Sequence, residues 1–160
     1  MQTPHIVVVG SINMDLVGRM ARLPRPGETL HGEDFQTIPG GKGANQAVAA
    51  ARLGARVTMI GRVGDDPFGE TLRQSLAGFG VNVEHVLTTP RCSSGVAMIS
   101  VETTGANSIV VIAGANGHLS PGDIRERSDV ISSADALVVQ LETPVETIAA
   151  AISIARQCGI

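Results

Sequence analysis

The chain has 160 residues, of which 43% are hydrophobic and 17% charged. This length suffices for one ordinary domain that buries its core without a disulfide or metal staple, and the composition excludes a mainly disordered chain. With 15 acidic against 12 basic residues, no Trp, no Tyr and only 3 Phe, the chain lacks the basic surface and stacking rings of a nucleic-acid binder.

The first elements alternate short apolar runs with helical patterns. Ile6–Val9 is a continuous apolar run, which predicts a strand buried on both faces. Asp15–Ile38 is glycine-punctuated and carries no helix signal, so we expect extended segments there. Ala44–Leu53 is rich in Ala and is followed by Gly54, which predicts a helix ended by glycine. Val57–Gly61 predicts the next buried strand.

The middle of the chain predicts one helix and one hairpin. The helix begins at Asp66 as N-cap with Pro67 in its first turn. Its buried face is expected to carry Phe68, Leu72, Leu76 and Phe79. In Ser94–Ala113, the turn-forming residues 105–107 separate two apolar runs, which predicts a hairpin. In both runs, apolar side chains occupy the positions that point to one face of a strand and also those that point to the other. A sheet built from these runs therefore needs other parts of the protein packed on both faces.

The last third continues the alternation. We expect a helix from Ser120-Pro121 and a strand over Ala136–Leu141. The residues Thr143-Pro144-Val145-Glu146 predict a capping box with Pro144 as the first helical residue. The buried stripe of that helix is expected to contain Val145, Ile148, Ile152 and Ala155. Strands alternating with helices indicate an α/β fold with a mostly parallel sheet covered on both sides.

A glycine cluster, Gly40–Ala47, opens directly into the Ala-rich helix. It is no Walker A loop, because Gly43 stands where Ser or Thr should follow Lys42, and no strand leads into a dinucleotide fingerprint. Two interpretations remain. Glycines before a helix start let a ligand approach the backbone N–H groups, with Lys42 and Asn45 as further donors; alternatively, the cluster is a turn with a solvated lysine.

Polar side chains follow two of the predicted strands. Asn13 and Asp15 come just after the first strand, two residues apart, so an extended backbone points them to the same side. An amide and a carboxylate together suit sugar hydroxyls, which both donate and accept. An Asx-turn is the alternative. Glu142 follows the strand near residue 140 and belongs either to the same edge or to a helix start.

Taken together, these residues resemble the ribokinase-like carbohydrate kinases. The similarity includes Gly10–Val17, residues 26–29, Gly40–Gly69, Gly114-Ala115-Asn116 and Gln140-Leu141-Glu142, with Ser94 in place of the usual Thr as a departure. The resemblance implies a three-layer αβα, Rossmann-like core with a small β-sheet lid formed by residues 15–38 and 94–113. It also implies a homodimer formed through the lid.

The resemblance further implies a site and a reaction. Asn13, Asp15, Gly41, Lys42, Asn45 and Glu142 would bind the sugar. The activity would be ATP-dependent phosphorylation of a pentose, with D-ribose to ribose 5-phosphate as the leading candidate. MgATP and a monovalent cation, potassium, would serve the full-length enzyme.

The family's Gly-Ala-Gly-Asp motif, which carries the catalytic base, does not occur in these 160 residues. We therefore expect residues 1–160 to be the N-terminal part of one sugar-kinase domain whose fold is incomplete at its C-terminus. The nucleotide-binding half is expected to be absent, and these residues are expected to contain no catalytic residue and no metal site. Alone it should be inactive and bind MgATP and potassium poorly. The alternatives are a non-catalytic sugar-binding or lid-dimerisation module and, less consistent with the missing phosphate loop, a nucleotide-binding regulatory domain.

The longest run without polar side chains, Ile109–Ala115, is far too short for a membrane span. Cys92 and Cys158 match no metal-ligand or redox spacing. We therefore expect a cytoplasmic protein whose partner is a small sugar, with no membrane or nucleic acid involved.

Overall fold

A parallel sheet forms the centre of the computed structural model, which describes residues 3–160. The strands of this five-stranded sheet are β1 (His5–Val9), β4 (Arg56–Gly64), β5 (Val81–Asn82), β6 (Val86–Thr89) and β9 (Ala136–Val139). Their order is β5-β4-β1-β9, and β6 pairs with the C-terminal part of β4. Val7, Val8 and Val9 are fully buried, which confirms a first strand covered on both faces.

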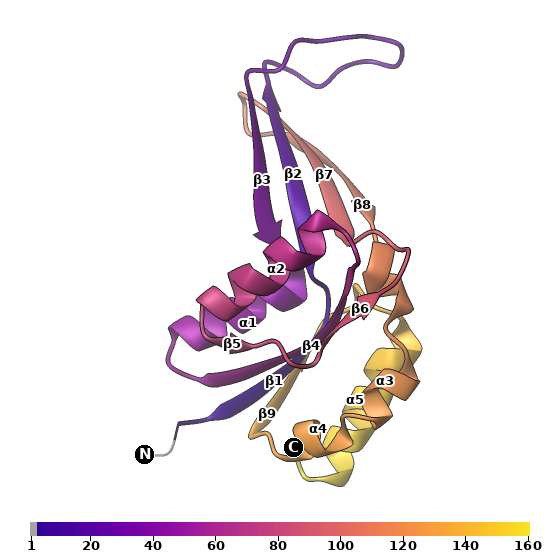
Figure 1. The fold of residues 1–160 in the computed structure, drawn as a ribbon. Helices are drawn as coiled ribbons and strands as arrows, with labels where there is room; N and C mark the ends of the chain where they lie inside the picture. Colours follow the sequence, from indigo (N-terminus) through magenta and orange to yellow (C-terminus); the bar gives the residue numbers. More distant parts are fainter. Residues whose placement is uncertain (1–2) are drawn as a thin grey trace.

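Helices cover both faces of this sheet (Figure 1). One side carries α1 (Lys42–Arg52) and α2 (Pro67–Gly78), and the other carries α3 (Pro121–Arg125), α4 (Ser128–Ser132) and α5 (Val145–Gln157). Successive residues of β1 serve opposite cores, since Val8 packs with Ala47 and Leu72 while Val7 and Val9 pack with Ile124. The predicted three-layer α/β architecture is confirmed.

A second, four-stranded sheet projects from the C-terminal edge of the first (Figure 1). It contains β2 (Asn13–Met20), β3 (Asp34–Gly40), β7 (Gly95–Glu102) and β8 (Asn107–Ile112), in the order β3-β2-β7-β8. The central pair β2–β7 is parallel, and both outer pairs are antiparallel. The expected extended segments and the hairpin are confirmed, and a short 3₁₀ helix, η1 (Gly114–His118), leads back into the core.

Two of the predicted helix starts are confirmed in detail. The Asp66 side chain accepts from Gly69 N at 2.8 Å, and Ser120 forms a capping box with Asp123. Leu72 and Leu76 are buried as expected, and Phe68 is half-buried. The prediction for Phe79 is wrong: it follows the last residue of α2 as C-cap and is 46% exposed, with the Arg52 guanidinium 5.5 Å from its ring centroid.

The capping box predicted at Thr143 is also wrong. Pro144 has φ −53° and ψ 134°, so it is the N-cap rather than the first helical residue, and its carbonyl accepts from Thr147 N and Ile148 N. Thr143 therefore lies one residue too early to cap α5, and its buried hydroxyl has no partner. The buried face is Thr147, Ile148, Ala151 and Ala155, while Val145 is exposed and Ile152 half-buried.

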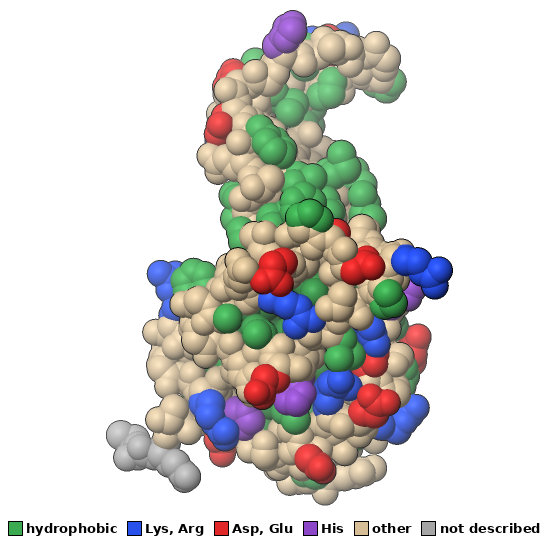
Figure 2. All heavy atoms as spheres, in the orientation of Figure 1, with side chains coloured by type: hydrophobic (Ala, Val, Ile, Leu, Met, Phe, Trp, Pro, Cys, Tyr) green, Lys and Arg blue, Asp and Glu red, His purple; other side chains and the backbone are tan. Residues whose placement is uncertain are grey.

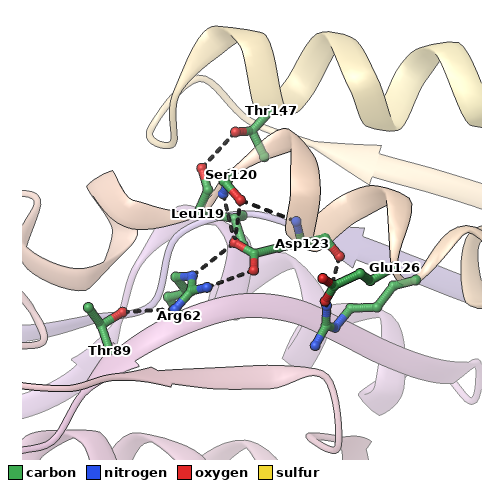
Figure 3. A network of polar contacts seen from close by, with 8 residues as sticks. Arg62, Thr89, Leu119, Ser120, Asp123, Glu126 and Thr147 are labelled. Carbon is green, nitrogen blue, oxygen red and sulfur yellow. Dashed lines mark hydrogen bonds and ion pairs between the residues drawn. The ribbon is translucent and has the colours of Figure 1, made fainter.

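An ion-pair network anchors α3 to the sheet (Figure 3). Arg62 of β4 donates to both carboxylate oxygens of Asp123, at 3.0 and 2.6 Å, and to Thr89 Oγ1 at 3.2 Å. Asp123 also accepts from Ser120, which fixes the first turn of α3. Burial favours the neutral acid, but these hydrogen bonds outweigh it and hold the pKa of Asp123 below its ordinary value.

Within residues 3–160, no helix is long and apolar enough to span a bilayer.

Candidate functional site

A cleft of about 250 Å³ lies between the two sheets. All six residues that the sequence analysis predicts as sugar ligands line this cleft. They are Asn13, Asp15, Gly41, Lys42, Asn45 and Glu142. The cleft sits beyond the carboxyl ends of the central strands, where open α/β sheets bind ligands. The structure thus brings together residues from β2, the start of α1 and the turn after β9.

The glycines at the start of α1 allow that helix to begin against the chain between β1 and β2. Gly41 has φ 93°, and a Cβ there would lie 2.8 Å from Asn13 N. At Gly43, a Cβ would lie 2.7 Å from Ser11 N and 2.8 Å from Gly10 C. Since these contacts are with backbone, any side chain would push the helix away from the cleft. The glycine cluster therefore serves close packing as well as access to the first turn of α1.

Two residues, Ser11 and Lys42, donate hydrogen bonds to Glu142 in the cleft. Ser11 Oγ donates to its Oε2 at 2.7 Å, and Lys42 Nζ lies 2.6 Å from its Oε1. Burial alone would raise the pKa of Glu142, but the hydrogen bonds from Lys42 and Ser11 lower it below the ordinary value. Glu142 is thus a fixed anionic acceptor. Ser11 is 1% exposed, and the sequence gives no signal for its role because its partner lies in the turn after β9, 131 residues away.

Asp15 is a second acceptor on the same wall. It shares a face of β2 with Asn13, as two-residue spacing requires. Gly40 of β3, which pairs with Asn13, leaves the space that the Asp15 carboxylate occupies: a Cβ there would be 2.5 Å from Asp15 Oδ2. Burial, and then the negative charge of Glu142, raise the pKa of Asp15. The two carboxylates therefore differ: hydrogen bonds stabilise the charged form of Glu142, whereas burial and the charge of Glu142 disfavour the charged form of Asp15.

Asn13 is 4% exposed and its amide is tied to Asn116 of η1. Asn116 Nδ2 donates to Asn13 Oδ1 at 2.7 Å. The sequence motif 114–116 pointed to this segment, but no role for Asn116 follows from the sequence, because its partner is 103 residues away. Among the predicted ligands, Asn45 and Lys42 are exposed on the first turn of α1.

Beside Asp15, on the same face of the small sheet, the lining of the cleft is apolar. Ala97 and Ile99 of β7 and Ile109 and Val111 of β8 face it. Figure 2 shows hydrophobic side chains gathered over the stem of the small sheet, and Ile109 and Val111 are 52% and 54% exposed. A site that combines carboxylates and amides with a neighbouring patch of aliphatic carbons can hold a small polyol, which carries both hydroxyls and C–H groups.

The described residues contain no cluster of metal-ligating side chains. Within residues 3–160, no group of three or more His, Cys, Asp or Glu side chains is placed to hold a metal ion.

Comparisons with known proteins identify the family of the chain. A family model described as pfkB family carbohydrate kinase matches residues 3–160. The chain is 43% identical to the ribokinase of Haemophilus influenzae and 43% identical to the deoxyribokinase of Salmonella typhimurium, covering 97% of this chain and 51% of each relative. The structure of Arabidopsis thaliana ribokinase complexed with ribose and ATP superposes with a TM-score of 0.85 at 31% identity, over 99% of this chain and 52% of that one.

The chain thus spans about half the length of the relatives that it matches. The family model, in contrast, matches every residue from 3 to 160. On this match, the chain belongs to the pfkB family of carbohydrate kinases.

Proposed function

We propose that these 160 residues are the sugar-binding portion of an ATP-dependent sugar kinase that phosphorylates a pentose. The observation that carries the proposal is the convergence of Asn13, Asp15 and Glu142 on one cleft whose lining beside Asp15 is apolar. Asp15 and Glu142 accept from sugar hydroxyls, while Asn13, Asn45 and Lys42 donate to them. Gly41 allows the sugar to approach the N-terminal backbone of α1.

D-ribose is the proposed sugar, to be converted to ribose 5-phosphate. Relatives from Haemophilus influenzae, Schizosaccharomyces pombe and Bacillus subtilis are named ribokinase, at 43–46% identity. Because a deoxyribokinase is also 43% identical, the test is a direct comparison: calorimetric titration of the chain with ribose and with 2-deoxyribose. We expect ribose to bind more tightly. Equal affinity would favour a broader pentose site, and no heat with either sugar would contradict sugar binding.

We propose that the 160 residues do not transfer phosphate by themselves. The charged groups at the cleft do not suit MgATP: two are carboxylates, and the ammonium of Lys42 is already paired with Glu142 at 2.6 Å. The residues present therefore do not fit the triphosphate, and we assign no nucleotide to them. Phosphoryl transfer needs charge stabilisation and a base that this cleft does not supply. A coupled ADP-release assay with ribose and ATP tests this, and ribose-dependent turnover would contradict it.

A second candidate function is self-association through the lid, the small sheet of β2, β3, β7 and β8. Apolar side chains are exposed on both of its faces: Met98, Val110 and Ile112 on one and Ile109 and Val111 on the other. Exposed apolar surface of this kind is uncommon on monomers and favours a closed two-fold pairing. We propose a homodimer, in the cytoplasm, where the free thiols of Cys92 and Cys158 stay reduced.

A further inference from the structure

We propose that Asn116 is a positioning residue that fixes the polarity of the Asn13 amide, so that Asn13 presents its N–H donors to the cleft beside the Asp15 acceptor. The inference rests on the proposed sugar-binding function. It assigns a role to a residue of η1 that does not line the cleft and that is 1% exposed.

The orientation of the Asn116 amide follows from two backbone groups. Its Oδ1 accepts from Ile12 N at 2.9 Å, and its Nδ2 donates to Ile12 O at 3.1 Å. A backbone N–H can only donate and a carbonyl can only accept, so exchanging the O and N atoms of Asn116 would break both bonds. The usual ambiguity of a side-chain amide is therefore absent here.

The second hydrogen of Asn116 Nδ2 then sets the Asn13 amide. It points to Asn13 at 2.7 Å, and because Nδ2 has no acceptor capacity, the atom facing it must be Asn13 Oδ1. The Nδ2 group of Asn13 is left for the cleft. Gly95 makes the pair possible, since a Cβ there would lie 2.1 Å from Asn116 Nδ2 and 2.2 Å from Asn13 Oδ1.

The orientation of the Asn13 amide determines which ligand group the cleft can bind next to β2. Asn13 offers N–H donors and Asp15 offers a carboxylate acceptor from the same face of the strand. A hydroxyl satisfies both, because it accepts with its lone pairs and donates its hydrogen. A carbonyl or ether oxygen cannot donate to Asp15, and an ammonium cannot accept from Asn13. Burying either group unmatched costs binding free energy, so Asn116 contributes to selectivity for a hydroxyl.

The amide polarity can be tested without any sugar, by NMR on the deuterated, ¹⁵N,¹³C-labelled chain. We expect a scalar coupling across the hydrogen bond from Asn116 Nδ2 to Asn13 Cγ. We also expect slow solvent exchange for the Asn116 side-chain amide protons and fast exchange for those of Asn13. Protected Asn13 protons without the coupling would overturn the assignment.

Two substitutions then separate positioning from a merely structural role. In Asn116→Asp, acceptor atoms replace the donors, so the Asn13 amide should turn over, its protons should become protected, and ribose affinity should fall by roughly 10–100-fold. Asn13→Asp keeps its bond from Asn116 but places an acceptor in the cleft, and should lose affinity by the same order. Asn82→Asp, in β5 at the edge of the large sheet, matches the charge change as control and should bind ribose like the parent chain.

Each result is decisive. Folded Asn116→Asp that binds ribose within twofold of the parent chain overturns the proposal. If Asn116→Asp does not fold, Asn13→Asp decides, and undiminished affinity there overturns it. If the parent chain shows the coupling and exchange pattern but binds no ribose, the amide polarity stands and the proposed sugar-binding function fails.

Discussion

The ammonium of Lys42 lies 2.6 Å from Glu142 Oε1, although 100 residues separate the two in the chain. The pair joins the first residue of α1 to the segment after β9, across the floor of the cleft. Because the Lys42 side chain is 68% exposed, the pair itself contributes little to stability. Its effect is on the carboxylate, which stays charged and fixed in orientation next to Asp15.

Removing the charge of Glu142 should lower the pKa of Asp15. Burial raises that pKa first and the negative charge of Glu142 raises it further, so Glu142→Gln removes the second cause and leaves the first. The measurement is an NMR pH titration of the Asp15 carboxyl carbon. Glu146→Gln, in the first turn of α5, is the control and should leave the pKa of Asp15 unchanged. An unchanged value in Glu142→Gln would show that the two carboxylates do not interact.

Asp15→Asn should spare or increase stability while weakening ribose binding. The folded-state pKa of Asp15 is raised, so its stabilising contribution is present below the unfolded-state pKa and is lost as pH rises through the folded value. At pH 7 the carboxylate therefore opposes folding, and at pH 3 the two proteins should unfold alike. Ribose affinity should fall by roughly 10–100-fold, since charged hydrogen bonds are lost.

Urea unfolding at both pH values, together with calorimetry, measures these effects. A variant clearly less stable than the parent chain at pH 7 would instead mean that Asp15 supports the turn after β1.

Asp123→Asn should destabilise the fold by about 2–3 kcal/mol at pH 7, because it leaves the half-buried Arg62 without its carboxylate. The pKa of Asp123 is lowered, so this stability is present above the ordinary carboxyl pKa and is lost as pH falls through the folded value. The difference between variant and parent should accordingly shrink below about pH 4. Thermal unfolding across pH 2.5–7 measures it.

The exposed pair Arg22–Glu28 provides the control for that experiment. Hydrogen bonds from Arg22 and Arg25 hold the pKa of Glu28 at about 2, yet the carboxylate is in solvent. Glu28→Gln should leave the unfolding transition near that of the parent chain. Equal destabilisation by Glu28→Gln and Asp123→Asn would contradict the role given to burial.

Gly43→Ala should cost about 1–3 kcal/mol, because the added methyl meets the backbone of Gly10 and Ser11 closer than 3 Å. It should also weaken ribose binding by displacing the start of α1. Gly78→Ala is the matched control: nothing lies within 4 Å of the added atom at the last residue of α2, so stability should rise by about 0.5–1 kcal/mol. Chemical denaturation of both variants decides, and a harmless Gly43→Ala would contradict the close packing.

Lid pairing can be assigned to one face of the small sheet. Ile99 faces the cleft and Ile112 lies on the opposite face, so Ile99→Lys and Ile112→Lys place a charge on one face each. Sedimentation should show monomers for the substitution on the pairing face. Leu53→Lys, which is 88% exposed at the end of α1, is the control and should leave association unchanged. Dimers in all three variants would reject lid pairing.

The sequence predicts most of the fold because its signals are local. Asp66 and Ser120 precede a proline and cap the next helix through their own side chains, so spacing alone finds them. Thr143 carries the same signal and fails, because the extended ψ of Pro144 shifts the start of α5 by one residue. That shift depends on how the end of β9 meets the helix, which no local pattern contains.

The candidate site was predictable where the side chains follow their own strand. Asn13 and Asp15 come directly after β1, and strand periodicity places them on one face. Ser11 and Asn116 could not be assigned in this way, since their roles depend on Glu142 and on the Ile12 backbone, each more than 100 residues away. Long-range partners of buried polar groups require the topology.

The parallel pairing of β2 with β7 has a consequence for the order of synthesis. Asn13 pairs with Gly95, so the hairpin of β2 and β3 leaves the ribosome well before the strand that completes its sheet. At ~5–20 residues per second, the wait lasts on the order of several seconds. During that time the apolar residues of the hairpin, Phe35 and Ile38 among them, have an open strand edge beside them. The nascent chain is therefore most open to chaperone capture or misassembly before residue 102 is made, and more than half of it must be synthesised before β7 completes the lining of the cleft.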